Sequence, residues 1–263
     1  MLYEIYSTTD RGMVRENNED AVAIDLPSGL CVLADGMGGY NAGEIASGMA
    51  CAFIKSEMSR WLMQVGKNAS AKDVRRALEI CVQNANHSIF NAANSNPQYT
   101  GMGTTLVVGV FQDGRLLLGH IGDSRCYRLR AGDFQQITKD HSLLQDQIDA
   151  GLITAEQALT AANKNLVTRA LGVEDAVLLD VTEHRVEEGD IYLMCSDGLS
   201  DMVQDGQIAD MMKANNTLEQ TGKLLVQTAN ESGGRDNISV VLATASANPA
   251  FVKRGLLSRV LGK

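Results

Sequence analysis

Acidic residues stand where apolar, strand-like segments of this sequence end. The run Leu30–Ala34 leads into Asp35, Ile191–Cys195 leads into the segment that carries Asp197, and Asp236 immediately precedes the last apolar run. A carboxylate at a strand terminus projects beyond the sheet while the strand stays buried. Several such ends on one rim would therefore bring their carboxylates together. Clustered carboxylates repel one another and lose solvation, so a fold that gathers them needs a cation.

Further acids follow the same pattern. Asp123 comes shortly after an apolar run, and Glu19 and Asp20 precede another. Oxygen ligands without a histidine or cysteine partner favour a hard ion, Mg²⁺ or Mn²⁺. For any single acid a turn or surface role is the simpler interpretation, and Asp113-Gly114 and Asp205-Gly206 are predicted to be turns only. The set as a whole, and not any one member, predicts a metal centre.

A glycine-rich stretch, residues 36–43, follows the strand that ends at Asp35 and precedes a helical pattern. It does not satisfy the Walker A pattern, because Glu44 stands where that motif requires lysine. The interpretation we favour is that its glycines let the backbone pass close to a metal bound at Asp35. The carbonyl oxygen of Gly36 would then be a ligand.

Composition excludes several classes of protein. The chain has 263 residues with a formal net charge of −9, whereas nucleic-acid binders normally carry a basic excess. Its five cysteines include no Cys-x-x-Cys pair, which argues against a thiolate zinc site or a disulfide framework. No apolar run is long enough for a transmembrane helix, and no signal peptide is visible. We therefore expect a cytoplasmic protein that binds no nucleic acid.

The remaining candidates for chemistry are given structural roles. His120 lies in a predicted strand and His141 in a polar segment, and we interpret both as structural. Cys195 lacks the arginine that a cysteine phosphatase places six positions after its nucleophile, since Asp201 stands there. Cys195 is therefore interpreted as a small buried strand residue.

Short β-branched segments and helical periodicities predict an α+β fold of antiparallel sheet flanked by helices. Hairpin turns are expected at Asp113-Gly114 and Gly132-Asp133. The predicted strands are 2–7, 21–26, 30–34, 105–111, 116–121, 125–130, 177–186, 191–195 and 238–244. The predicted helices are 43–64, 71–94, 154–163, 205–214 and 217–231, with Ser70 capping the second. We expect one domain over residues 1–247, followed by a basic, amphipathic tail over residues 248–263.

Several short motifs occur in an order that matches a known family. They are Asp10-Arg11-Gly12, Arg15, Asn18-Glu19-Asp20, Asp35-Gly36-Met37-Gly38-Gly39, Gly43, Gly103-Thr104-Thr105, Gly122-Asp123-Ser124-Arg125, Ser196-Asp197-Gly198, Asp201 and Gly234-Arg235-Asp236-Asn237. Over about residues 3–245 the chain resembles the metal-dependent protein serine/threonine phosphatases of the PP2C (PPM) family, in the short bacterial form.

The resemblance implies a four-layer α-β-β-α sandwich and a centre of two Mg²⁺ or Mn²⁺ ions, with a third, weaker ion. Asp35 would bridge the two core ions, Glu19 and the Gly36 carbonyl would hold one, and further acids would hold the other. The acids implied for that second ion are Asp197 and Asp236, with Asp20 acting through its water. The acids implied for the third ion are Asp123, Asp197 and Asp201.

The resemblance also implies a reaction. Arg15 would grip the substrate phosphate, and a metal-bridging hydroxide would attack phosphorus in line, with no phosphoenzyme. Asn237 would support the site. Met37 stands where eukaryotic members carry a histidine proposed as general acid, so the proton donor is left unassigned. Residues 142–170 would form a mobile flap beside the cleft.

The expected function is hydrolysis of phosphoserine and phosphothreonine in proteins that a companion serine/threonine kinase phosphorylates. The alternative is a catalytically inactive, phosphoprotein-binding regulatory module of the same fold. We expect a monomer. The basic tail is interpreted either as a contact for a membrane surface or partner protein, or as a segment that packs on its own domain.

Overall fold

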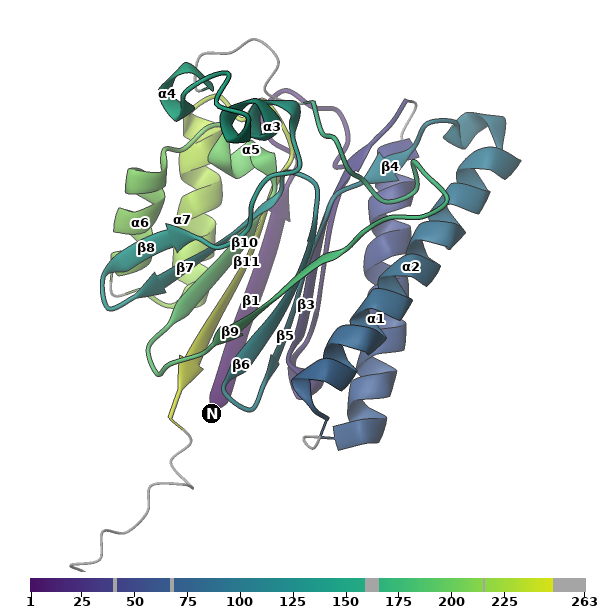
Figure 1. Cartoon of the computed structure of the whole chain (residues 1–263). Coiled ribbons are helices and arrows are strands. Elements are labelled where there is room, and N and C mark those ends of the chain that lie inside the picture. The colour runs from purple at the N-terminus through teal and green to yellow at the C-terminus, as the bar shows by residue number, and fades with distance from the viewer. Residues whose placement is uncertain (40–41, 67–68, 159–165, 215, 248–263) are drawn as a thin grey trace, which may run out of the picture.

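Two antiparallel sheets form the centre of the computed structural model (Figure 1), which describes residues 1–39, 42–66, 69–158, 166–214 and 216–247. The first sheet has the order β1 (Leu2–Asp10), β11 (Ile238–Ser246), β10 (Ile191–Cys195), β7 (Arg125–Arg130) and β8 (Asp133–Gln136). The second has the order β2 (Asp20–Asp25), β3 (Leu30–Met37), β5 (Leu106–Gln112), β6 (Arg115–Ile121) and β9 (Asp180–Arg185). The short strand β4 (Gly103–Thr104) pairs with β3.

Helices cover the outer face of each sheet, as Figure 1 shows. The long helices α1 (Ala42–Val65) and α2 (Ala71–Ser95) pack on the second sheet, and α6 (Asp205–Lys213) and α7 (Leu218–Glu231) pack on the first. The short helices α3 (Leu143–Asp149), α4 (Ala155–Ala158) and α5 (Asp197–Ser200) lie at one end of the sandwich. The predicted four-layer α-β-β-α architecture is confirmed.

The pattern of β3 explains why its segment is continuously apolar. Leu30 and Val32 face the α1–α2 layer, whereas Cys31 and Leu33 face the first sheet. A strand that is buried on both faces needs an apolar residue at every position. Each fully buried leucine or valine contributes about 1.5–3 kcal/mol relative to the exposed state. The strand therefore stays fixed while its end carries polar residues to the rim.

Local signals account for most element boundaries. Asp113 and Gly114 both have positive φ, 50° and 74°, as a two-residue type I′ hairpin requires. Ser70 caps α2 as predicted, by accepting a hydrogen bond from the Asp73 amide in a capping box. The cysteines, all five of which are free and buried, are packing residues.

Some boundaries differ from the sequence-based expectation. The β7–β8 turn is formed by Ala131-Gly132, one residue before the predicted Gly132-Asp133. Asp205 and Gly206, predicted to be a turn, begin α6, and the Gln207 side chain accepts a hydrogen bond of 3.3 Å from the Gln204 amide at the start of that helix. The strand predicted over 177–186 is restricted to Asp180–Arg185, the part that pairs with β6.

Four short elements were not predicted. The helices α3 and α5 have seven and four residues, too few for a helical period, and the strands β4 and β8 have two and four. Of the helix predicted over 154–163, residues 155–158 are helical and 159–163 lie outside the described residues. The basic tail, 248–263, also lies outside them. Across the described ranges, no helix has the length and apolar character needed to span a membrane.

Candidate metal centre and substrate site

Asp20 and Asp35 lie directly opposite each other on the neighbouring strands β2 and β3. Side chains at opposed positions share one face of the sheet with Cβ atoms about 5 Å apart, and like charges placed so are destabilising. Burial raises the pKa of Asp20 to about 6. Burial, and then the charges of Asp20, Asp197, Asp123 and Asp236, raise the pKa of Asp35 well above its usual range. The fold thus places two carboxylates where burial and mutual repulsion disfavour the ionised form of each.

The two oxygens of the Asp20 carboxylate have different environments. Its Oδ2 accepts a hydrogen bond of 2.8 Å from the Ser196 hydroxyl. Its Oδ1 is buried and has no hydrogen-bond partner among the described residues. A buried, unpaired carboxylate oxygen is costly unless something else satisfies it. A bound cation, or water held by one, would do so.

Asp197 and Asp123 extend this cluster. Asp197 begins α5 directly after β10, and burial, then the charges of Asp123, Asp236, Asp201 and Asp20, raise its pKa well above the usual value. Burial, followed by the charge of Asp140, raises the pKa of Asp123 to about 6, and Asp201 adds to this shift. Acids from five chain segments therefore act on one another, which the sequence could only suggest.

Glu19, Asp236 and Arg15 form the more open side of the cluster. The Arg15 guanidinium donates from Nη2 to Asp236 Oδ2 at 2.6 Å, with the side chains 48% and 28% exposed. Burial raises the pKa of Glu19, Arg15 opposes this shift, and Asp236 and Glu44 add to it. Arg15 is therefore the cation that reaches the cluster from solvent, as a phosphate-binding arginine must.

Asn237 holds the segment that carries Arg15 and Glu19. Its buried Oδ1 accepts from the Glu19 amide at 2.7 Å, and its Nδ2 donates to the carbonyls of Arg11 and Asn17 at 2.9 and 2.8 Å. All three contacts join chain segments more than 200 residues apart. This geometry suits the supporting role that the resemblance implies for Asn237.

Two glycines allow close approach at the end of β3. A Cβ on Gly43 would lie 2.8 Å from the Gly36 carbonyl oxygen and 2.9 Å from the Glu19 carboxylate carbon. The Gly36 amide donates to the Glu19 carbonyl at 3.0 Å. Gly43 thus sits against the two groups, the Gly36 carbonyl and the Glu19 carboxylate, that were predicted to share an ion. The expectation that these glycines let the backbone pass close to a metal bound at Asp35 stays a prediction.

Gly43→Ala is expected to push Glu19 and the Gly36 carbonyl apart. We expect the Mn²⁺ concentration for half-maximal activity to rise about tenfold or more, in the range seen when groups that support metal ligands are changed. Gly48→Ala, on the same helix with open space around its Cβ, is the matched control. The control should leave this midpoint unchanged, and equal behaviour of the two variants would contradict the close-approach argument.

Several hydroxyl-bearing residues beside the acids were not among the site residues predicted from the sequence. Ser196 bonds Asp20, and it also accepts from the Ser239 amide at 2.9 Å. Thr105 Oγ1 accepts from the Asp35 amide at 3.0 Å, and Thr104 Oγ1 donates to the Asp35 carbonyl at 2.8 Å. Each is adjacent to a predicted ligand or lies in a matching motif. A buried hydroxyl within an apolar run is the signal that could have identified them.

The residues present fit a centre for hard cations. Donors at the site are carboxylate and carbonyl oxygens, and one of them, Asp20 Oδ1, is buried without a partner. Within the described ranges, however, no three His, Cys, Asp or Glu side chains already converge on a single point as in a closed metal site. The fold gathers the acids into one electrostatic cluster, and closure around an ion would need further side-chain adjustment.

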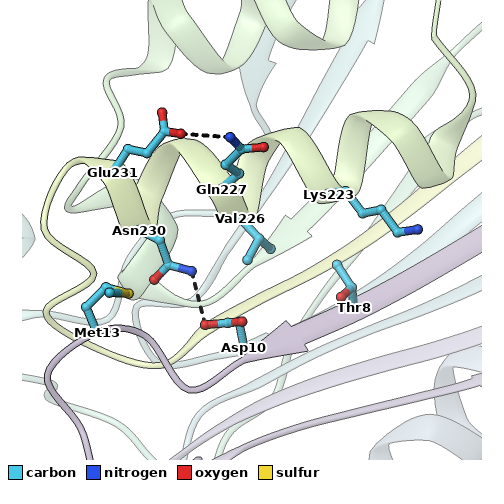
Figure 2. A pocket seen from close by; sticks show the side chains of 8 residues that line it. All are labelled: Thr8, Asp10, Met13, Lys223, Val226, Gln227, Asn230 and Glu231. Carbon is cyan, nitrogen blue, oxygen red and sulfur yellow. Dashed lines mark hydrogen bonds between the residues drawn. The ribbon is translucent and has the colours of Figure 1, made fainter.

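A separate groove of about 460 Å³ is shown in Figure 2. It lies between α7 and the end of β1, and Met13 and Val226 supply apolar surface there. Asn230 spans it by donating to Asp10 Oδ1 at 3.1 Å. None of the predicted site residues lines this groove.

Comparison with known proteins decides the family. Residues 12–243 match the family model of protein phosphatase 2C. This chain belongs to that family. The family assignment made from the motifs is confirmed, and with it the fold.

Relatives of this PP2C chain carry the same description. It is 34% identical to the serine/threonine phosphatase Stp of Listeria innocua over 89% of this chain and 92% of that protein. It is 41% identical to PstP of Mycobacterium tuberculosis over 89% of this chain and 43% of that longer protein. The crystal structure of Mycobacterium tuberculosis PstP superposes with a TM-score of 0.86 at 37% identity, covering 94% of this chain and all of that one. This PP2C chain is a phosphoprotein phosphatase of the serine/threonine type, as predicted.

Proposed function

We propose that this phosphatase removes phosphate from phosphoserine and phosphothreonine in proteins, using Mn²⁺ or Mg²⁺ held by the acid cluster. The observation that carries the proposal is the opposed pair Asp20 and Asp35, with the buried Asp20 Oδ1 unpaired. Further support is a related PstP catalytic domain, 36% identical with a TM-score of 0.80, whose structure is described as a complex with two manganese ions.

The proposed ligands follow the clustering. Asp35 would lie between two core ions, of which Glu19 and the Gly36 carbonyl hold one. Asp197 and Asp236, with Asp20 acting through water, would hold the other. Asp123 and Asp201, both of which raise the pKa of Asp197, would join Asp197 around a third and weaker ion. When bound, such ions supply an activated water and neutralise developing charge on the phosphoryl group.

The chain's own residues bind and orient the phosphate. Arg15 can form paired hydrogen bonds to two phosphate oxygens, and its 2.6 Å contact with Asp236 fixes it beside the ligand cluster. Cys195 is not a suitable nucleophile, because it is buried and burial raises the pKa of its thiol to about 12. A thiol with that pKa is inert at neutral pH. In-line attack by water, without a phosphoenzyme, is therefore the reaction we propose.

The test is hydrolysis of an aryl phosphate and a phosphothreonine peptide with Mn²⁺ and with a chelator. We expect turnover that requires the metal for both substrates. Turnover that persists after the metal is removed would contradict the proposed mechanism. Uniform absence of turnover with Mn²⁺ and Mg²⁺ would favour the alternative, an inactive phosphoprotein-binding module. The presence of every predicted ligand, together with Arg15 and Asn237, supports the enzyme.

Arg15→Ala is expected to lower kcat/KM for the phosphothreonine peptide by about 10²-fold, the effect of losing one preorganised charge-stabilising group. Steady-state kinetics at saturating Mn²⁺ measure this effect. Arg76→Ala, an exposed arginine on α2, is the control and should leave kcat/KM unchanged. A loss of less than threefold in Arg15→Ala would remove Arg15 from the proposed substrate site.

We also propose a cytoplasmic location, a monomer and substrates supplied by a companion serine/threonine kinase. Five buried free cysteines suit a reducing compartment. The tail over residues 248–263 is proposed to contact a membrane surface or a partner, and its deletion tests this. If deletion changes neither location nor activity, the tail has no such role.

A further inference from the structure

Two neighbouring histidine rings hold the turn that carries Asp123. The Gly122 amide donates to His141 Nδ1 at 3.0 Å, and His120 Nε2 lies 2.8 Å from the Ser124 carbonyl oxygen. The two imidazole centroids are 4.8 Å apart, with 35° between the ring planes. The residues directly before and after Asp123 are therefore each bound by one imidazole.

The partners determine where the ring protons lie. Because Gly122 donates to Nδ1 of His141, that nitrogen is unprotonated, and Nε2 carries the hydrogen donated to Asp180 Oδ2 at 3.0 Å. The Ser124 carbonyl can only accept, so His120 donates from Nε2. Burial lowers the pKa of both rings, that of His120 to about 4. Both rings are neutral and have one defined tautomer, as an orienting histidine requires.

His141 connects this turn to the chain that returns from the predicted flap. The Thr168 amide donates to the His141 carbonyl at 2.9 Å, and the His141 amide donates to the Gly122 carbonyl at 2.8 Å. Arg169 donates from Nη1 to Asp180 Oδ1 at 2.8 Å, on the carboxylate that His141 also contacts. The Asp180 carboxylate thus contacts the side chains of both His141 and Arg169 and holds them next to each other.

The opposite side of the turn reaches Asp35. The hydroxyls of Ser124 and Thr105 are 2.8 Å apart and buried, and Thr105 Oγ1 accepts from the Asp35 amide at 3.0 Å. A continuous chain of hydrogen bonds therefore runs from Asp180 through His141 and the Asp123 turn to Asp35. Such a network restricts the arrangements of its members because neighbouring hydrogen bonds constrain and strengthen one another.

We propose that His141, oriented by Asp180, is a positioning residue that aims Asp123 into the acid cluster. The inference rests on the proposed metal-dependent function and goes beyond it by assigning His141 a role through Asp123. Groups that orient metal ligands contribute about 10–100-fold to metal affinity or activity. A purely structural His141 would instead contribute to stability alone.

Two substitutions at His141 separate these roles. The Oδ1 atom of asparagine lies close to the position of histidine Nδ1, so His141→Asn can still accept from Gly122, whereas His141→Ala cannot. For His141→Ala we expect amide exchange of Gly122 to accelerate about tenfold, as a protecting bond is lost. We expect the Mn²⁺ midpoint for activity to rise about tenfold in the same variant. His141→Asn should change each value less than about threefold.

A double-mutant cycle with Asp123→Asn tests the route of action. If His141 acts through Asp123, adding His141→Ala to Asp123→Asn should not raise the Mn²⁺ midpoint further. If the effects of the two substitutions on the Mn²⁺ midpoint multiply, the proposal is overturned, and an unchanged midpoint in His141→Ala would overturn it too.

If His141→Ala does not fold, Asp180→Ala takes its place, because Asp180 is half exposed and its loss removes the carboxylate that His141 Nε2 contacts. The variant should raise the Mn²⁺ midpoint, and an unchanged midpoint would again overturn the proposal.

Controls keep failure of this inference apart from failure of the proposed function. His87→Ala, on the exposed side of α2, should match the wild type in Gly122 exchange and Mn²⁺ midpoint. If the wild-type enzyme itself shows no Mn²⁺-dependent turnover, the proposed function fails. If it does and the His141 variants shift neither the midpoint nor Gly122 exchange, only the positioning role fails.

Discussion

Asp35→Asn is expected to abolish metal-dependent turnover and, at the same time, to stabilise the metal-free protein. The Asp35 carboxylate lies opposite Asp20, and burial together with the charges of four neighbouring acids raises its pKa. Removing the Asp35 charge therefore relieves repulsion among these acids. If Asp35 lies between two cations as proposed, its loss removes several kcal/mol of charge stabilisation, and each 1.36 kcal/mol is a factor of ten in rate. We expect kcat to fall at least about 10³-fold.

Both readouts come from one preparation. Aryl phosphate hydrolysis at saturating Mn²⁺ gives kcat, and thermal unfolding in chelator gives the stability. Asp113→Asn, in the hairpin turn after β5, is the control, since asparagine tolerates its positive φ. Wild-type turnover in Asp35→Asn would remove Asp35 from the site. A lower melting temperature in chelator would contradict the account of repulsion in the cluster.

The metal-free protein is expected to be more stable near pH 5 than near pH 7.5. Burial raises the pKa of Asp20 from 3.8 to about 6, so the folded state binds more protons than the unfolded state between these values. Stability contributed by this group is present at low pH and is lost as pH rises through about 6. Asp123 shifts in the same direction, as do Asp35 and Asp197.

Saturating Mn²⁺ should reverse this trend. Cations bind the ionised cluster, so the increase in melting temperature on adding Mn²⁺ should be larger near pH 7.5 than near pH 5. A pKa unit corresponds to about 1.4 kcal/mol. For a domain of this size each kcal/mol shifts the melting temperature by about 2–4 °C, so Asp20 alone predicts a change of several degrees.

Melting scans across this pH range, in chelator and in Mn²⁺, provide the measurement. The double variant Asp20→Asn with Asp123→Asn should flatten the metal-free profile, whereas Asp133→Asn, on the exposed β8 strand, should not. A metal-free protein that gains stability from about pH 5 to about pH 7.5 would contradict the cause assigned to the shifted pKa values.

Regular elements were predictable because their signal is local. The apolar run Leu30–Ala34 is buried on both faces, and that burial is visible as an unbroken run in the sequence. The Asp113-Gly114 turn and the Ser70 cap were predicted for reasons that involve only neighbouring residues. The helix α5, by contrast, has four residues and forms where β10 delivers Asp197 to the rim. Its formation depends on packing against β11 and α7, which no local pattern records.

The features of the site likewise divide into those that the sequence indicates and those that only the folded structure shows. By itself the sequence determined which residues are candidates for the chemistry, since carboxylates at strand ends and the order of the motifs named Asp35, Asp197, Asp236 and Arg15. Tertiary structure decided that Asp20 lies opposite Asp35, that Asn237 ties the Arg15 loop to β11, and that His141 binds the Gly122 amide beside Asp123. The physical reason is the short range of these interactions in space compared with the separation of the residues along the chain. Charge and hydrogen bonding act through space over a few ångström, whereas these partners are 15 to more than 200 residues apart, so only the folded sheets bring them within reach.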